Sequence, residues 1–373
     1  MKTKLSLCVA ALLAFGVAAY GQVNKGSTTP PPNPATGPES TSDVGKYANW
    51  DQLSKAARPG DYLRGTVSVE GGGLPWDPIA VNVTCDDKPT YDTRTDVKGV
   101  FLITFTTATG PAKPDAKRSK AAQYIGCQVQ ARLSGFQSST ITVPNRDLTD
   151  NPDIGVITLR QEEGAQGGAM SGTSQSAPKD AVKNYEKARA EWLDQKPDRA
   201  QHDLEKAVQI YPQYAEAWYQ LGKLQENSNP KEAHNSFSKA AAADPKFILP
   251  YEHLATMAAL EGKWQELLDC TNHLLELEPR GTPRIWYYNA LANANLKNDK
   301  AAEASARKGL AMDPLHTEPN TEQLLAVVLV AGRNYAEALE HLRECLTYFP
   351  PGPNADLVKQ QISQLEHAMG ASK

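Results

Sequence analysis

Histidine and glutamate pairs are the residues of this 373-residue chain whose types and spacing could bind a metal ion. Three of its seven histidines begin a His-x-x-Glu spacing: His202 with Glu205, His273 with Glu276, and His341 with Glu344. Zinc sites on helices use this spacing, but a catalytic site also needs a third ligand and a general base. The sequence offers no context for either, so the pairs predict contacts on helix surfaces.

Other motifs of catalysis are missing from the sequence. It contains no Gly-x-Ser-x-Gly nucleophile motif, no Gly-rich phosphate loop and no Cys-x-x-Cys pair. We therefore predict a protein that is not an enzyme and that has no catalytic residues, no cofactor and no metal. A hydrolase remains a third class of function, after the two binding classes given at the end of this subsection.

Charge and hydropathy exclude two further classes. The chain has 39 Lys and Arg residues against 43 Asp and Glu residues, a net charge of −4. Binding to nucleic acid through phosphate contacts needs a basic surface, so a nucleic-acid partner is not expected. The mean hydropathy of −0.50 excludes a protein with several membrane spans.

Residues 1–21 have the pattern of a secretory signal peptide. Lys2 and Lys4 precede an apolar run over 5–19, and small residues precede Gln22. The run is shorter than the roughly 20 residues that cross a bilayer, so no membrane span is expected after cleavage. A leader rich in Pro, Thr and Ser follows over 22–60. We predict a bacterial protein that is exported and is periplasmic, outer-membrane-associated or secreted.

Residues 61–161 show the period-two pattern of β-strands. Gly, Asp and Pro residues separate short segments in which apolar and polar residues alternate: 63–69, 79–83, 100–105, 128–131, 141–143 and 154–159. Short strands at this spacing predict a small antiparallel β-sandwich.

The same region resembles the carboxypeptidase regulatory-like domain, a transthyretin-type sandwich of seven strands. The resemblance rests on Gly65-Thr66-Val67, Pro75, Val81-Asn82-Val83, the segment from Thr95 to Phe101, and the segment from Ile154 to Leu159. Within it, Asp96 is expected to accept hydrogen bonds from the following backbone and Gly99 to adopt a conformation that other residues resist. The resemblance implies a fold and no peptidase activity.

Cys85 and Cys127 are the only cysteines of this region. Each lies at the end of a predicted strand, and an exported protein can keep a disulfide. We predict a bridge between them, with two buried thiols as the alternative. Cys270 and Cys345 fall in the helical half and are expected to be buried and unbridged.

After a Gly- and Ser-rich linker at 162–178, residues 179–369 change to the period of helices. Five prolines recur at intervals of 33 to 36 residues: Pro212, Pro245, Pro279, Pro314 and Pro350. An interval near 34 residues is typical of stacked helix pairs. These residues predict five helix pairs in an all-α solenoid, closed by a capping helix at 355–367.

The repeats resemble the tetratricopeptide repeat. The resemblance is clearest over one unit, which contains Trp218, Leu221, Gly222, Ala233, Phe237, Ala240 and Pro245. First helices of such repeats line a concave groove that binds peptides. The resemblance places these residues towards that groove: Tyr185, Arg189, Tyr219, Gln220, Lys223, Asn227, His253, Arg284, Tyr287, Tyr288 and Asn295.

The leading hypothesis is an exported, non-enzymatic scaffold that binds a protein or peptide in this groove. Tyr185 and Arg189 stand where repeats that bind chaperone tails carry Lys and Asn, which argues against that class of partner. The alternative is an envelope- or carbohydrate-binding protein whose specificity lies in the sandwich. Its support in the sequence is Trp50 and Trp76, which stand in loop-like surroundings.

Overall fold

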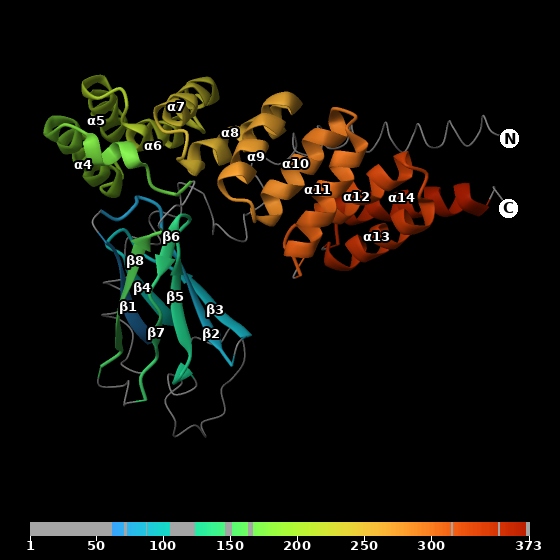
Figure 1. The fold of residues 1–373 in the computed structure, drawn as a ribbon, viewed down its shortest axis with the longest axis horizontal. Coiled ribbons are helices and arrows are strands. Elements are labelled where there is room, and N and C mark those ends of the chain that lie inside the picture. Colours follow the sequence, from blue (N-terminus) through green and yellow to red (C-terminus); the bar gives the residue numbers. More distant parts are fainter. Residues whose placement is uncertain are drawn as a thin grey trace. The chain divides into compact units, whose positions relative to one another are not determined.

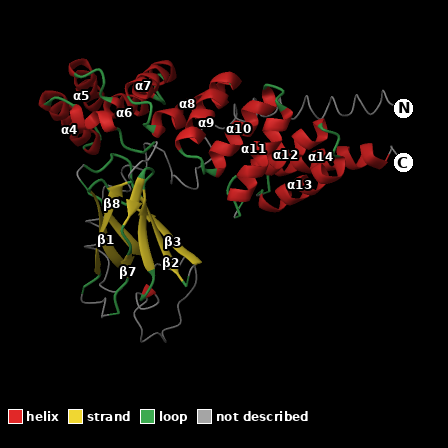
Figure 2. Cartoon of the chain, viewed as in Figure 1, coloured by secondary structure: helices red, strands yellow, loops and turns green. Residues whose placement is uncertain are grey.

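The computed structural model describes residues 62–70, 73–86, 88–104, 124–145, 151–162, 167–314, 316–349 and 351–370. The predicted signal peptide and leader lie outside these residues. Strands occupy the N-terminal part and helices the C-terminal part of the described chain (Figures 1 and 2). The described residues divide into two compact units, which we call the N-terminal unit, ending at Leu224, and the C-terminal unit, starting at Gln225.

The N-terminal unit contains a sandwich of two four-stranded sheets, in the orders β4-β1-β8-β6 and β3-β2-β5-β7. The strands are β1 (Tyr62–Val69), β2 (Ala80–Cys85), β3 (Lys88–Arg94), β4 (Val100–Thr104), β5 (Gln128–Arg132), β6 (Phe136–Ser138), β7 (Ile141–Thr142) and β8 (Asp153–Gln161). The sandwich prediction is confirmed, with eight described strands where the resemblance implies seven. The pairing of β1 with β8 is parallel, whereas the other pairs of strands are antiparallel.

The sandwich core follows from the alternation of apolar residues. Leu63 and Val67 of β1 and Val81 of β2 are fully buried because every second side chain of a strand points to the same face. Gly65 lies between two of them, and a Cβ at this position would overlap the ring of Phe101. The aromatic side chain that follows the Thr-Asp-x-x-Gly segment therefore fills the space that glycine leaves.

The turn before β4 has the predicted geometry. The Asp96 carboxylate accepts hydrogen bonds from the backbone N–H groups of Lys98 (2.9 Å) and Val100 (2.8 Å). Gly99 has a φ of +78°, in the left-handed region that glycine adopts without strain. Val97 lies in this turn, and its carbonyl group takes part in a contact described below.

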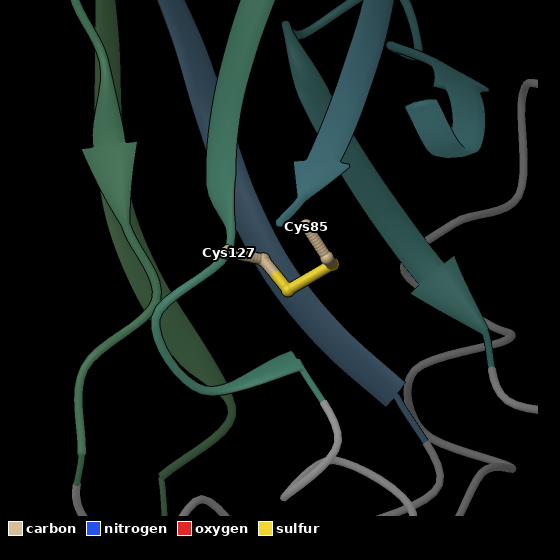
Figure 3. Close-up of a disulfide and its surroundings, with 2 residues drawn as sticks. All are labelled: Cys85 and Cys127. Atoms are coloured by element: carbon tan, nitrogen blue, oxygen red, sulfur yellow. A yellow bond between two sulfur atoms is a disulfide. The ribbon is translucent and has the colours of Figure 1, made fainter. Parts of the chain in front are cut away.

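A disulfide joins Cys85 and Cys127, as the sequence predicts (Figure 3). Cys85 ends β2 and Cys127 directly precedes β5, and these two strands pair with each other. The Cα atoms are 4.4 Å apart, within the range that a disulfide spans.

Removing this bridge with Cys85→Ala and Cys127→Ala together is expected to cost about 2–4 kcal/mol of unfolding free energy, because it releases a closed loop in the unfolded chain. Urea unfolding of the full mature chain measures the loss. A thiol titration of the unreduced, unfolded mature protein provides the control and should find only Cys270 and Cys345. Four reactive thiols instead would contradict the bridge.

The described part of the 162–178 segment is attached to the sandwich. The backbone N–H of Ala169 donates to the carbonyl of Ser134 (3.0 Å), and that of Glu162 donates to the carbonyl of Gly135 (3.0 Å). A short 3-10 helix, η3 (Gly172–Ser176), follows, with the Ser171 side chain capping its start. The described part of this segment is therefore hydrogen-bonded to the sandwich, and the boundary between the two compact units falls at Leu224/Gln225.

Eleven helices follow η3 in the described chain. They are α4 (Lys179–Leu193), α5 (Pro197–Ile210), α6 (Ala215–Gln225), α7 (Pro230–Ala243), α8 (Ile248–Glu261), α9 (Trp264–Leu277), α10 (Pro283–Asn295), α11 (Asp299–Met312), α12 (Asn320–Ala331), α13 (Tyr335–Tyr348) and α14 (Pro353–Gly370). They make five consecutive helix–turn–helix pairs and one closing helix, which confirms the predicted repeats.

The ends of these helices explain the proline spacing. Pro212, Pro245, Pro279 and Pro314 each lie two residues beyond the last residue of a second helix, where a proline prevents a further turn. Pro350 lies outside the described residues. Other prolines begin helices, as Pro230 and Pro283 do at the first turn of α7 and α10. Within the described part of the chain, no helix combines the length and the apolar character needed to cross a membrane.

Candidate protein-binding surface

Four of the predicted groove residues contact loops of the sandwich, all within the N-terminal unit. On α4, the Tyr185 ring lies 5.2 Å from the Trp76 ring, and Arg189 Nη2 donates to the Val97 carbonyl (2.9 Å). On α6, Tyr219 Oη donates to Asp77 Oδ2 (3.3 Å), and Lys223 forms an ion pair with the same carboxylate. The first helices of the first two pairs thus contact two loops of the sandwich, one between β1 and β2 and one between β3 and β4.

The contact with the sandwich buries the aromatic rings that take part in it. Trp76 is 9% exposed, Tyr185 7% and Tyr219 3%, and the predicted groove residue Gln220 is also buried. Burial raises the pKa of Tyr185 well above its ordinary value, with the Glu216 carboxylate adding to the shift. Trp76 therefore does not present its ring to a carbohydrate, and Trp50 lies outside the described residues.

The other predicted groove residues lie in the C-terminal unit. Asn227 is exposed. His253 Nδ1 lies 3.1 Å from Glu226 Oε1, and its ring stacks on Phe237. Arg284 Nε lies 3.6 Å from Glu318 Oε2, while Asn295 Nδ2 donates to the Leu291 carbonyl of its own helix.

Two neighbouring tyrosines of α10 have different environments. Tyr287 is buried, with 8% of its surface exposed, whereas Tyr288 is half-buried. Their ring centroids are 5.6 Å apart. Since successive residues of a helix point about 100° apart, only Tyr288 has its side chain partly at the surface. The partly exposed face of α10 includes Tyr288 and Arg284, and Tyr287 is buried.

The three His-x-x-Glu spacings differ in the structure. His273 Nδ1 lies 4.0 Å from Glu276 Oε2, and His202 is exposed. His341 contacts Glu322 of the neighbouring helix (2.6 Å) instead of bonding to Glu344. Glu344 lies in a cluster with His316 and Glu322 that the sequence analysis missed, because its members come from three separate segments.

The helical half keeps two free thiols, as predicted. Cys270 and Cys345 are both buried. Burial raises the pKa of each thiol to about 12, with nearby carboxylates adding to the shift. A thiol that stays protonated at neutral pH is a poor nucleophile, so neither cysteine has the environment of a catalytic residue.

A scan against protein-family models found no match, and neither did a search of the curated proteins. Among solved structures, MamA 41-end from Desulfovibrio magneticus RS-1 is 17% identical and covers 46% of this chain and 96% of its own, with a TM-score of 0.40. YrrB, described as a TPR protein with an unusual peptide-binding site, is 19% identical over 51% of this chain and 92% of its own (TM-score 0.42).

PilF of Pseudomonas aeruginosa is 16% identical over 51% of this chain and 86% of its own (TM-score 0.40). The helix pairs of this chain, with prolines that recur at intervals of 33 to 36 residues, resemble the tetratricopeptide repeat.

Proposed function

We propose that the protein is an exported, non-enzymatic scaffold that binds a protein or peptide through the first helices of its tetratricopeptide-like repeats. The observation that carries the proposal is the contact of α4 and α6 with the sandwich. There, two tyrosines and two basic residues bind an aromatic ring, a carboxylate and a main-chain carbonyl. These are the groups that a protein partner offers.

The C-terminal unit carries the same kind of residues on α10. Tyr287 follows Tyr219 by 68 residues, twice the 34 residues that separate Tyr219 from Tyr185. Tyr288, which follows Tyr287, and Arg284, about one helical turn before Tyr288, are half-buried. Tyrosine and arginine are enriched where protein interfaces bind most tightly, because they combine large contact areas with hydrogen bonding. We therefore place the partner-binding surface around α10.

Two further parts of the proposal concern the sandwich and the compartment. The sandwich, which resembles the carboxypeptidase regulatory-like domain, acts as a support that docks on the first repeats, and the burial of Trp76 favours this role over carbohydrate binding.

The Cys85–Cys127 bridge supports export, because disulfides persist in oxidising compartments.

Affinity capture from native envelope extract with the full mature chain tests the proposed function. Wild type is expected to retain a protein partner, and Tyr288→Ala is expected to lose it, because the ring supplies contact area at the centre of the surface. Glu276→Ala is the matched control, since the Glu276 side chain is 78% exposed on the second helix α9. Equal capture by wild type and Tyr288→Ala would count against the α10 surface.

A further inference from the structure

A cluster of metal-ligand side chains lies in the last helix pair, outside the surface described above. His316 is in the loop between α11 and α12, Glu322 is in the first turn of α12, and Glu344 is on α13. One ligand atom from each side chain lies within 4.8 Å of the ligand atoms of the other two. Three separate segments thus bring one imidazole and two carboxylates together.

The loop that carries His316 is held in place by its own hydrogen bonds. The Asp313 carboxylate accepts from the backbone N–H groups of Thr317 (2.9 Å) and Glu318 (2.8 Å), and the Asp313 carbonyl accepts from the N–H of His316 (2.9 Å). His316 has a φ of +49°, a conformation uncommon for residues other than glycine. Its ring stacks on Tyr348 at a centroid distance of 3.9 Å.

The His316 ring therefore has a fixed orientation, yet its Nδ1 atom lacks a hydrogen bond. Nδ1 is buried and has no hydrogen-bond partner among the described residues, although Glu322 Oε1 lies 3.5 Å away. Ligand atoms bound to one Zn²⁺ ion in a tetrahedron are about 3.4 Å apart, given bonds of about 2.0–2.2 Å. The 3.5 Å between His316 Nδ1 and Glu322 Oε1 is too long for a good hydrogen bond, and it fits two ligands of one metal ion.

The second oxygen of Glu322 is already bound. Its Oε2 atom lies 2.6 Å from His341 Nδ1, so the two oxygens of this buried carboxylate face different partners. His341 Nε2 lies 3.7 Å from Glu337 Oε1. Ligands in metal sites are commonly oriented by hydrogen bonds of this kind from neighbouring side chains. His341 is thus placed to orient Glu322, with Oε1 directed towards His316.

We propose that His316 Nδ1, Glu322 Oε1 and a carboxylate oxygen of Glu344 form a binding site for a divalent transition-metal ion. One imidazole and two carboxylates make a donor set that suits Zn²⁺ and related ions, and the charge of the ion offsets that of the two carboxylates. Glu344 is exposed, so its side chain can close on the ion from solvent. The proposal replaces the sequence-based expectation that the chain has no metal site.

Zinc titration of the tag-free, chelator-treated mature chain tests this site, with a colorimetric chelator as competitor. Wild type is expected to bind one Zn²⁺ per chain, and His316→Ala and Glu344→Gln are each expected to weaken that binding at least tenfold. His341→Ala, which removes an orienting group, is expected to weaken it about 10–100-fold. His202→Ala is the matched control, because His202 is an exposed histidine of another helix pair.

A change at a buried residue can disturb folding, and loss of zinc binding by such a variant would then be ambiguous. Because Glu344 is exposed, the Glu344→Gln variant tests the metal site without this ambiguity. Glu344→Gln should retain the circular dichroism spectrum of wild type while it loses the zinc. Zinc should also raise the melting temperature of wild type and leave that of Glu344→Gln unchanged. Failure of wild type to compete with the chelator, or equal affinity in wild type and Glu344→Gln, would overturn the proposal.

Discussion

Replacing Trp76 with alanine is expected to lower the free energy of unfolding of the N-terminal unit by about 3–5 kcal/mol. The indole packs in one apolar cluster with Tyr185 and with alanine and leucine side chains of α4, α5 and α6. Alanine would leave a cavity between the sandwich loop and the first repeat. Urea unfolding of the mature chain, followed by circular dichroism, measures the effect.

The Trp76→Phe variant separates the contribution of ring packing to stability from that of the indole N–H group. The indole Nε1–H is buried without a hydrogen-bond partner among the described residues. A buried donor without a partner costs free energy, so phenylalanine, which keeps a ring beside Tyr185 and lacks this donor, should destabilise far less than alanine. Val156→Ala is the control on the sandwich, because Val156 is 56% exposed. Equal stabilities for Trp76→Ala and Val156→Ala would show that the loop does not support the first repeat.

Tyr287→Ala is expected to lower the free energy of unfolding by about 3 kcal/mol, whereas Tyr288→Ala should cost well under half of that. Tyr287 lies in the buried part of α10, and removal of its ring leaves a cavity among the neighbouring helices. Urea unfolding of the two variants side by side makes the comparison. If the two variants were equally stable, α10 would not have the orientation described here.

The difference between these tyrosines also decides how loss of binding is interpreted. A Tyr287 variant that fails to capture a partner has lost stability, and its failure says little about contact with that partner. A Tyr288 variant with the stability of wild type tests contact directly. The same reasoning excludes Tyr219, which is 3% exposed and bound to Asp77, as a position for testing partner capture.

Features that depend on local sequence were predictable. The proline interval predicted the helix pairs, because a proline two residues after a second helix prevents a further turn whatever the helix packs against. The Asp96 turn was predictable for the same reason, since its hydrogen bonds join residues at most four positions apart. The disulfide needed only the pairing of two strands whose ends carry the cysteines.

Contacts between distant residues were not predictable from these patterns. Trp76 and Tyr185 are more than 100 positions apart, and nothing in the composition of the intervening segment shows that the chain returns there. The Gly- and Ser-rich composition of 162–178 indicated a linker, yet backbone hydrogen bonds fix its described part to the sandwich. His316, Glu322 and Glu344 match no motif, because a loop and two helices bring them together.

Site-specific photocrosslinking tests the central claim most directly. A photoreactive phenylalanine at position 288 of the mature chain, irradiated in native envelope extract, is expected to crosslink to the protein captured by wild type. The same group at Glu276, on the exposed side of α9, is the matched position and should give no such product. A partner that crosslinks from position 276 and not from 288 would contradict the claim that the first-helix surface around α10 binds it.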